Sequence, residues 1–309
     1  MTNPQSTSHI LMIRPVNFNF NEETAGSNAF QNRNAAKNDV NKKAQHEFDG
    51  MVSILRENGV DVTVIDDTPD PYTPDSIFPN NWISFHADGT VFLYPMQAEN
   101  RRLERREDII TQIEDCFEVK HTIDLSRFEL ENKFLEGTGS MVLDRENKIA
   151  FACVSPRTDR EVLALFCEQG GYKEVSFHAF DEYHQAIYHT NVLMCIGSKF
   201  AVVCLDSIAQ DDEKNSVVSI LKLTHKEIIN ISFEQMNQFA GNMLEVKNKK
   251  GETLIVMSEN AYNSLNQSQK NALEKFGKLV YDDINTIENN GGGSARCMMA
   301  EVHLPVVHS

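Results

Sequence analysis

"GSMVLDRENKIAFACVSPRTDREVLALFCEQGGYKEVSF", residues 139–177, holds one full round of the predicted architecture of this chain. Residues 139–155 contain two apolar runs joined by a polar turn, which is typical of a β-hairpin. Residues 158–171 carry apolar side chains at helical spacing and end in two glycines, which predicts an amphipathic helix. Residues 173–180 are strand-like again. One round is therefore a hairpin, a helix and a further strand.

Parts of this order recur on both sides of the segment. Before it, the patterns predict a strand at 8–16, a helix at 42–59, a strand at 60–66, a hairpin at 81–96 and a charged helix at 100–116. After it, they predict a hairpin at 192–206, a helix at 212–224, a strand at 251–258, a helix at 268–277 and extended segments at 278–284 and 295–305.

The rounds share their element order but little sequence, which is compatible with a cyclic α/β arrangement of roughly five units of about 60 residues each. A generic mixed α/β sheet is the alternative. Because no Pro/Gly/Ser-rich linker divides the chain, we expect residues 1–309 to form a single α/β domain.

Composition narrows the classes of partner. The chain has 309 residues, is 41% hydrophobic and carries a formal net charge of −16, which disfavours nucleic acid and anionic membrane surfaces. Its start lacks the basic and apolar regions of a secretory signal, and it has no long uninterrupted apolar run. We therefore expect a cytoplasmic protein with no membrane partner. An oligomeric state does not follow from the sequence, and a homodimer is one option.

The six cysteines do not form a metal or disulfide pattern. None belongs to a CxxC pair or lies beside a histidine at zinc-finger spacing, so reduced thiols are expected. Five of them lie in core-like or helical runs or at a helix end. Cys297 alone follows a glycine-rich run, in "NNGGGSARCMMAEVHLP", residues 289–305.

Three further polar groups stand next to predicted strands. They are Asp75 with Asn80 and Asn81 in residues 73–82, Glu136 ahead of two glycines, and His189 with Asn191, which share one side if that segment is extended. Each alone is more typical of a turn or of a hydrogen-bonded structural residue. In a cyclic arrangement, however, the equivalent edges of successive units converge near the axis.

Together, a thiol, an imidazole and a carboxylate supply a nucleophile, a proton carrier and an orienting group, the minimum for covalent acyl-type chemistry. Competing motifs are incomplete. The chain has no GK[ST] phosphate loop, no complete GxGxxG after a strand and no HExxH, so we expect neither a nucleotide, a catalytic metal nor any other cofactor.

The segments "PDSIF" (74–78), "LEGTGS" (135–140), "HTN" (189–191) and "GGGSARCM" (291–298) resemble the signatures of the guanidino-group-modifying superfamily. This superfamily includes arginine deiminases, dimethylarginine dimethylaminohydrolases and amidinotransferases. Residues 12–31 and 74–82 are most similar to its citrulline utilisation hydrolase branch. The resemblance runs from about residue 10 to residue 305 and implies a five-bladed pseudo-symmetric α/β propeller, the pentein fold.

The resemblance also implies roles for individual residues. Cys297 would be the nucleophile, His189 the general acid/base and Glu136 the carboxylate that holds a substrate nitrogen. Asp75 and Phe78 would line the substrate pocket. A weaker correspondence makes Arg157 a substrate-binding residue, and a still weaker one makes Arg14 a contact for the substrate carboxylate.

Two departures from the arginine-cleaving relatives bear on the substrate. Those relatives place aspartates where this chain has Asn81 and Asn191. A guanidinium presents only N–H donors, whereas the ureido group of citrulline also presents a carbonyl oxygen, which an asparagine N–H can satisfy. We therefore expect a small amino-acid substrate with a ureido group, namely citrulline, cleaved through an S-carbamoyl enzyme to ornithine, carbon dioxide and ammonia.

Two alternatives stay open. One is a guanidino-group hydrolase or amidinotransferase that acts on arginine or a methylated arginine, since Asp75 is retained. The other is a ligand-binding protein without catalysis, against which the joint presence of Cys297, His189 and Glu136 argues.

Overall fold

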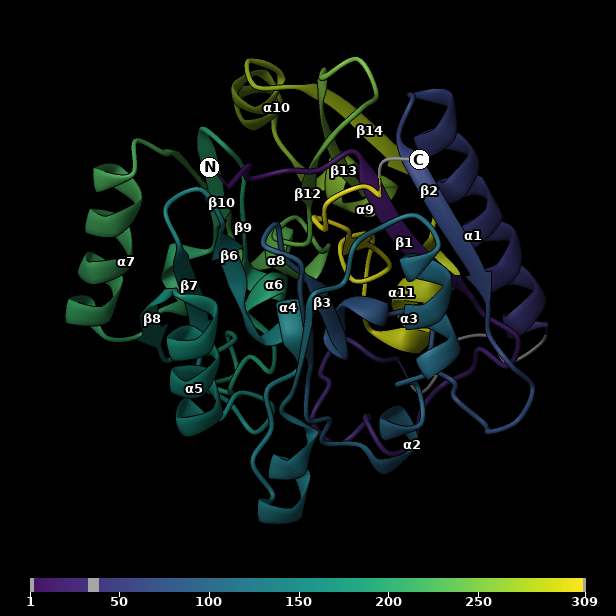
Figure 1. Cartoon of the computed structure of the whole chain (residues 1–309). Coiled ribbons are helices and arrows are strands. Elements are labelled where there is room, and N and C mark those ends of the chain that lie inside the picture. Colours follow the sequence, from purple (N-terminus) through teal and green to yellow (C-terminus); the bar gives the residue numbers. More distant parts are fainter. Residues whose placement is uncertain (1–2, 33–38, 308–309) are drawn as a thin grey trace.

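Five small sheets surround a common centre in the computed structural model, which describes residues 3–32 and 39–307 (Figure 1). Within the described residues each sheet has three strands, and its middle strand pairs antiparallel with one neighbour and parallel with the other. The sheets, or blades, are β15–β1–β2, β3–β4–β5, β6–β7–β8, β9–β10–β11 and β12–β13–β14. This arrangement confirms the predicted cyclic α/β fold.

The strands are short. Their bounds are β1 His9–Arg14, β2 Asp61–Asp66, β3 Ile83–Phe85, β4 Thr90–Leu93, β5 His121–Asp124, β6 Val142–Asp144, β7 Ile149–Cys153, β8 Lys173–Phe177, β9 Met194–Ile196, β10 Phe200–Val203, β11 Glu227–Asn230, β12 Leu244–Lys247, β13 Thr253–Ser258, β14 Lys278–Asp282 and β15 Ala300–Glu301.

The helices divide into two groups. The longest helices in the connections between the two parallel strands of each blade are α1 Val40–Glu57, α3 Glu107–Glu114, α5 Arg160–Gly170, α7 Asp211–Leu223 and α10 Gln267–Glu274, and α1, α5, α7 and α10 lie at the periphery of Figure 1. The others are α2 Glu99–Arg102, α4 Gly137–Ser140, α6 Thr190–Leu193, α8 Phe233–Asn237, α9 Glu259–Ser264, α11 Asn285–Gly291 and the 3₁₀ turns η1 Pro79–Asn81, η2 Ser126–Glu131 and η3 Leu205–Ser207.

The blade that contains residues 142–177 shows why the sequence folds this way. The Asp159 side chain accepts hydrogen bonds from the N–H groups of Glu161 and Val162, which starts α5, and Gly171 ends it in the left-handed conformation (φ 68°). One face of α5 is buried against the sheet. All five residues of β7 are buried, as expected for a middle strand covered on both faces.

Several local predictions differ from the structure. The charged segment 100–116 forms two short helices, α2 and α3, instead of one. Residues 295–299 form a turn, and only Ala300 and Glu301 of the predicted extended segment 295–305 belong to β15. His189 and Asn191 do not share one side of a strand, because His189 precedes the one-turn helix α6, which contains Asn191.

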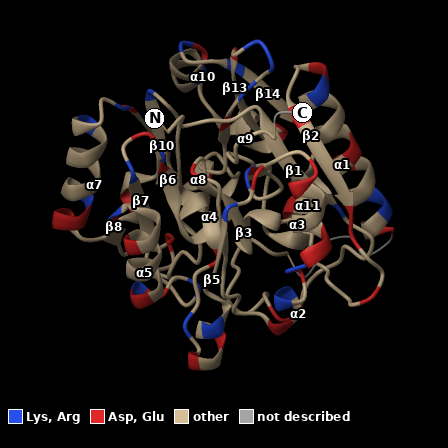
Figure 2. Cartoon of the chain, in the orientation of Figure 1, with Lys and Arg blue, Asp and Glu red and all other residues tan. Residues whose placement is uncertain are grey.

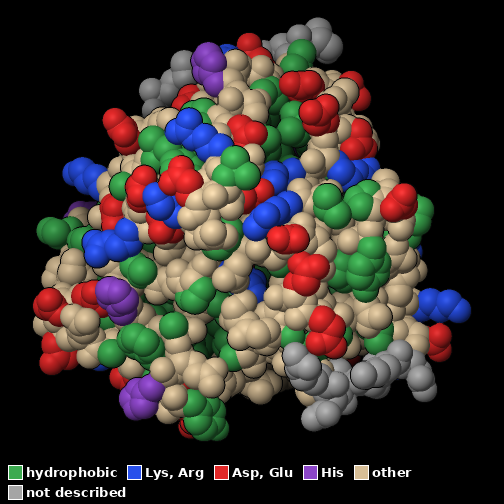
Figure 3. Space-filling view, turned by 90° about the horizontal axis from the view of Figure 1, so that it is seen from below, with side chains coloured by type: hydrophobic (Ala, Val, Ile, Leu, Met, Phe, Trp, Pro, Cys, Tyr) green, Lys and Arg blue, Asp and Glu red, His purple; other side chains and the backbone are tan. Residues whose placement is uncertain are grey.

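Acidic and basic residues are interspersed along the outer helices α1, α5 and α7 in Figure 2. The face in Figure 3 likewise mixes both signs with apolar side chains. Among the described residues, no helix combines the length and apolar character needed to cross a membrane.

Turns ahead of the first strand of each blade build the centre. These turns are η1 before β3, α4 before β6, α6 before β9, residues 238–242 before β12 and residues 295–298 before β15. Glycines allow them to approach closely. The position of a Cβ on Gly137 lies 2.3 Å from the Asn80 carbonyl oxygen, and that of a Cβ on Gly241 lies 2.3 Å from the Val192 carbonyl oxygen.

Candidate active site

Each of the five central turns contributes one polar side chain to the same region. The side chains are those of Asn81, Glu136, His189, Asn242 and Cys297, and all are buried. Three of them, Glu136, His189 and Cys297, come from signature segments that lie far apart in the sequence, and Asn81 lies three residues after a fourth. The blade arrangement brings them together because the turns occupy equivalent places around the centre.

A small inner cavity lies among these groups. Asp75, Asn81, His189 and Cys297 line it, and Phe78 forms part of its wall against Gly291 and Gly293, at the end of α11 and just beyond it. Its volume is about 10 Å³, roughly the room that one water molecule needs. An amino-acid side chain therefore enters only if part of the wall moves.

Glu136 and His189 form a buried pair. The Glu136 Oε2 lies 2.8 Å from the His189 Nε2. Burial alone would raise the pKa of Glu136, but the Arg157 charge and the His189 hydrogen bond lower it below its usual value. Burial lowers the pKa of His189 to about 4, against the opposing effect of Glu136. At neutral pH, an ionised Glu136 thus accepts the Nε2–H of a neutral imidazole, whose Nδ1 keeps its lone pair.

Cys297 is 5% exposed and lies in the turn of residues 295–298, where its backbone N–H donates to the Ser294 carbonyl oxygen. Two carboxamide nitrogens, Asn191 Nδ2 and Asn242 Nδ2, each lie 3.4 Å from its Sγ. The turn itself is fixed from behind, because the Ser294 hydroxyl donates to Glu288 Oε1 at 2.6 Å. The sulfur therefore sits in a polar, rigid setting at the cavity wall.

Asp75 supplies a second carboxylate to the cavity. Its Oδ2 accepts a hydrogen bond from Asn21 Nδ2 at 2.8 Å and lies 3.9 Å from Arg101 Nε. Within the described part of the chain its Oδ1 has no hydrogen-bond partner. Burial raises the pKa of Asp75, although the Arg101 charge opposes this effect. A buried carboxylate oxygen without a partner is costly and suits a ligand that donates a hydrogen bond.

Arg101 extends from α2 and lines the cavity. Its guanidinium makes two hydrogen bonds of 2.9 Å to Glu104 and one of 2.8 Å to Asn81 Oδ1. Burial raises the pKa of Glu104 to about 7, against the effect of Arg101. The Asn81 side chain is thereby oriented with its oxygen toward Arg101, and its Nδ2 has no partner among the described residues.

Residues 21–32, here called the strap, cover the cavity. Arg157 reaches the strap through Ser27 Oγ at 2.7 Å and the Thr24 carbonyl oxygen at 3.2 Å, while its Nη1 lies 3.4 Å from Glu136 Oε2. The strap also contacts the glycine-rich segment before Cys297, because Asn28 Nδ2 donates to the Gly291 carbonyl oxygen at 3.3 Å. The strap therefore contacts Arg157 on one side of the cavity and the glycine-rich segment before Cys297 on the other.

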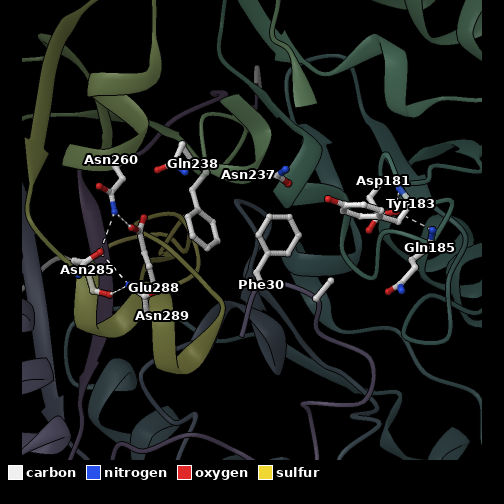
Figure 4. A pocket seen from close by; sticks show the side chains of 12 residues that line it. Phe30, Asp181, Tyr183, Gln185, Asn237, Gln238, Asn260, Asn285, Glu288 and Asn289 are labelled. Carbon is white, nitrogen blue, oxygen red and sulfur yellow. Dashed lines mark hydrogen bonds between the residues drawn. The ribbon is translucent and has the colours of Figure 1, made fainter. Parts of the chain in front are cut away.

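A larger outer pocket of about 580 Å³ lies beside the strap (Figure 4). Carboxamide side chains surround it, with Phe30 between the two halves of the view. Phe30 contacts the ring of Tyr188, which lines the inner cavity, at 6.2 Å between centroids. Phe30 and Tyr188 therefore stand between the outer pocket and the inner cavity. The pocket carries Asp181 and Glu288, and among its described lining residues there is no Lys or Arg.

The structure brings together most of the residues singled out in the sequence. Cys297, His189, Asp75, Asn81, Phe78 and Arg157 line the inner cavity, and Glu136 lies behind His189. Asn191 contacts the Cys297 thiol but does not line the cavity. Arg14 is elsewhere: it pairs with Asp49 at the surface, at 2.8 Å, because the end of β1 faces α1.

Sequence reasoning did not single out Arg101, Glu104, Asn242 or Tyr188. Arg101 and Glu104 lay in a segment with so many charges that neither stood out. Asn242 had one usable signal, because it is a polar residue shortly before the first strand of a blade, as Asn81 and Asn191 are.

Comparison with known proteins supports this description. A family model described as eukaryotic N,N dimethylarginine dimethylhydrolase matches residues 14–304. No curated protein matches the chain. Among solved structures, the arginine dihydrolase ArgZ from the ornithine-ammonia cycle in cyanobacteria has a TM-score of 0.76 at 18% identity, covering 97% of this chain and 41% of that one. The substrate-bound N-terminal domain of ArgZ, a mutant form, has a TM-score of 0.75 at 18% identity, with 97% of this chain and 99% of the domain covered.

A dimethylarginine dimethylaminohydrolase adduct is similar at a TM-score of 0.62 and 15% identity, with 95% of this chain and 98% of that chain covered. The chain thus spans about two fifths of full-length ArgZ and nearly all of its N-terminal domain. At these identities the solved structures show the fold, and they confirm the pentein resemblance.

Proposed function

Because the chain belongs to the eukaryotic N,N dimethylarginine dimethylhydrolase family, we propose that it is a hydrolase that uses the Cys297 thiol to open the guanidino group of an arginine-like amino acid. The family match agrees with a reaction at a guanidino carbon. It favours this alternative over the citrulline specificity that the asparagines alone predict.

The observation that carries the proposal is the convergence of the thiol, the His189–Glu136 pair and Asp75 at one small cavity. A thiol that cleaves a C–N bond needs a proton carrier beside it and a group that holds the substrate nitrogens. These three functions come from three different blades and from the loop before β3, so their meeting is a property of the fold.

The charge balance of the cavity favours a cation. Arg101 faces Glu104 and Arg157 faces Glu136, which leaves Asp75 with an oxygen unpaired among the described residues. A guanidinium supplies both a positive charge and N–H donors to such an oxygen. The outer pocket, which carries Asp181 and Glu288, would also favour a cationic substrate, since carboxylates attract cationic amino acids.

In the proposed reaction, His189 takes the thiol proton and the sulfur bonds to the guanidino carbon. The C–N bond to a terminal nitrogen then breaks, and His189 returns the proton so that ammonia, or an alkylamine from a methylated arginine, leaves. Water adds to the S-amidino enzyme and the C–S bond breaks, which releases citrulline and the free thiol. Entry of the substrate requires part of the cavity wall to move, given the size of the cavity.

Cleavage of a ureido group is the second candidate. The Nδ2 of Asn81 is a buried donor without a partner in the described residues, and a guanidinium offers it no acceptor. The carbonyl oxygen of citrulline does. In this reaction the δ-amine of ornithine would leave, and hydrolysis of the S-carbamoyl enzyme would yield carbamate, hence carbon dioxide and ammonia.

Product analysis tests both candidates. The purified chain is incubated separately with arginine, asymmetric dimethylarginine and citrulline, and citrulline, ornithine, dimethylamine and ammonia are followed by mass spectrometry and colorimetry. We expect citrulline from a guanidino substrate, and a Cys297→Ser variant that folds normally but is slower by several orders of magnitude, because an alcohol is a weaker nucleophile than an activated thiol.

Cys195→Ser is the matched control, since Cys195 is a buried thiol in β9 and should be dispensable for turnover. Ornithine formed from citrulline alone would establish the second candidate in place of the first. The proposal fails if wild-type protein turns over none of the three substrates, or if Cys297→Ser keeps full activity.

A further inference from the structure

The contacts of the Cys297 sulfur include one residue to which the proposed reaction gives no role. Asn242, fully buried in the turn before β12, places its Nδ2 at 3.4 Å from Sγ. Asn191 approaches the same sulfur at the same distance from α6. Two carboxamides from neighbouring blades therefore flank the nucleophile.

The orientation of the Asn242 amide is fixed by its other hydrogen bonds. Its Oδ1 accepts the backbone N–H of Arg296 at 3.0 Å, and its Nδ2 donates to the Asn191 carbonyl oxygen at 2.9 Å. A flipped amide would lose both contacts. The second N–H of Nδ2 thus faces the sulfur, while the neutral thiol can donate to Oδ1 at 3.7 Å.

The charged groups near the thiol do not supply an equivalent contact. His189 shares the cavity with Cys297, but it is neutral at neutral pH, so no imidazolium is present before the reaction starts. The Arg296 guanidinium, one residue away, turns to the Met299 carbonyl oxygen and to Glu301.

Three further charged groups, Arg101, Arg157 and Asp75, line the cavity, and Glu136 lies behind His189. Arg101 and Arg157 are engaged by Glu104 and Glu136, and Asp75 and Glu136 are anionic groups that disfavour a second negative charge nearby. A thiolate in this cavity therefore depends on neutral N–H donors, of the kind that stabilise developing negative charge in other active sites.

We propose that Asn242 is a positioning residue that, together with Asn191, holds the ionised Cys297 sulfur through N–H···S contacts and keeps it directed at the cavity. This inference rests on the proposed function, in which Cys297 is the nucleophile. It assigns a role to the blade that contains β12, which contributes no residue to the sequence signatures.

The test is the rate of alkylation of Cys297 by iodoacetamide across pH 6–9, followed by mass spectrometry of the peptide that contains Cys297. Asn242→Asp keeps the oxygen that accepts the Arg296 N–H but replaces the donor with a second acceptor. We expect alkylation at pH 7 to be about tenfold slower, with the midpoint of the pH profile moved upward by about one unit.

Asn248→Asp is the matched control. Asn248 is also buried, and its Oδ1 also accepts backbone N–H groups, but it lies at the other end of β12, about 20 Å along the extended chain. Its profile should equal that of the wild type. If Asn242→Asp does not fold, Asn242→Ala takes its place, with a slowing of at least about threefold expected from the loss of one donor.

A folded Asn242 variant with the wild-type alkylation profile would overturn the inference. The alkylation assay needs no substrate, so its outcome is independent of the product analysis. Failure to hydrolyse any guanidino or ureido compound would remove the proposed function, whereas an unchanged profile would remove the role of Asn242 alone. A supporting kinetic result is a lower kcat with an unchanged KM.

Discussion

At the scale of single residues, Asn81 shows how one side chain can define what a cavity accepts. Arg101 holds its Oδ1 at 2.8 Å, so its Nδ2 is the end left for a ligand. Asn80 and Ser76, nearby in the chain, also carry buried polar atoms unpaired among the described residues. Such groups cost free energy in the empty protein, which a complementary ligand recovers on binding.

Asn81→Asp should therefore shift preference toward guanidinium substrates. The new carboxylate keeps the contact with Arg101 and presents a second acceptor in place of the N–H donor. We expect the ratio of kcat/KM for arginine to that for citrulline to rise by about 10- to 100-fold, equivalent to about 1–3 kcal/mol. Competition assays on wild type, Asn81→Asp and the remote Asn248→Asp measure it. An unchanged ratio would mean that Asn81 does not contact the head group.

At the scale of elements, α4 packs beside the His189–Glu136 pair through two glycines with different constraints. Gly137 has a φ of 48° and meets backbone oxygens, so a side chain there would strain the fold. At Gly139 the position of a Cβ lies 2.4 Å from Asn81 Nδ2 and 2.8 Å from His189 Nδ1. This second contact involves functional side chains, so its effect should fall on the reaction.

Gly139→Ala should reduce kcat by at least about tenfold while the protein stays folded, because the methyl group displaces the imidazole from its position beside Glu136. Gly26→Ala is the control: a Cβ on Gly26 meets nothing within 4 Å, so full activity is expected. Steady-state kinetics and a circular dichroism melt of both variants provide the comparison. Equal activity of the two would show that the His189 ring tolerates displacement.

At the scale of the whole molecule, a second buried cluster of charged residues connects the blade β15–β1–β2 with the blade β6–β7–β8. Glu301 on β15 contacts Arg296 at 2.8 Å, Arg145 beyond β6 at 3.5 Å and His303 at 3.3 Å. Burial lowers the pKa of His303 to about 4 from its ordinary 6.5. Neutral His303 is thus part of the folded state, whereas the unfolded chain binds a proton there below about pH 6.5.

His303→Gln should weaken the pH dependence of stability. The free energy contributed by neutral His303 is fully present above about pH 6.5 and is lost as the pH falls to about 4, because only the unfolded chain takes up the proton in that range. Relative to the variant, the wild type should lose about 1.4 kcal/mol per pH unit in this window. Urea denaturation of both proteins from pH 4 to pH 8 measures the difference. Parallel curves would contradict the assignment.

Sequence patterns predicted the middle strand of each blade and missed several of the strands at the sheet edges. All of β7 is apolar and buried, so its pattern was clear, whereas β5 is largely exposed and lacks apolar alternation. β11 and β12 were missed as well, because short strands at the edge of a small sheet owe their conformation to pairing and not to local preference.

The residues of the candidate site were also predicted only in part. Chemically distinctive residues in glycine-rich turns, such as Cys297 and Glu136, could be found from the sequence. Arg101 could not, and Asn242 had only its place before β12 as a signal, because the two side chains act through contacts with Asn81 and Cys297, which lie far from them in the sequence. The segment of His189 and Asn191 is not extended, so the expectation that the two share one side does not hold. A one-turn helix such as α6 leaves almost no periodic signal in the sequence.

The pairing of β15 with β1 has a consequence for biogenesis. Leu11 and Ile10 align with Ala300 and Glu301, and the cysteine stands three residues upstream of this junction. Four blades consist of strands consecutive in the sequence, so they can form before β15 pairs with β1, and until then the sulfur is not held beside Asn191 and Asn242. On the proposed function, the recovery of turnover in a refolding experiment would therefore report the docking of β15.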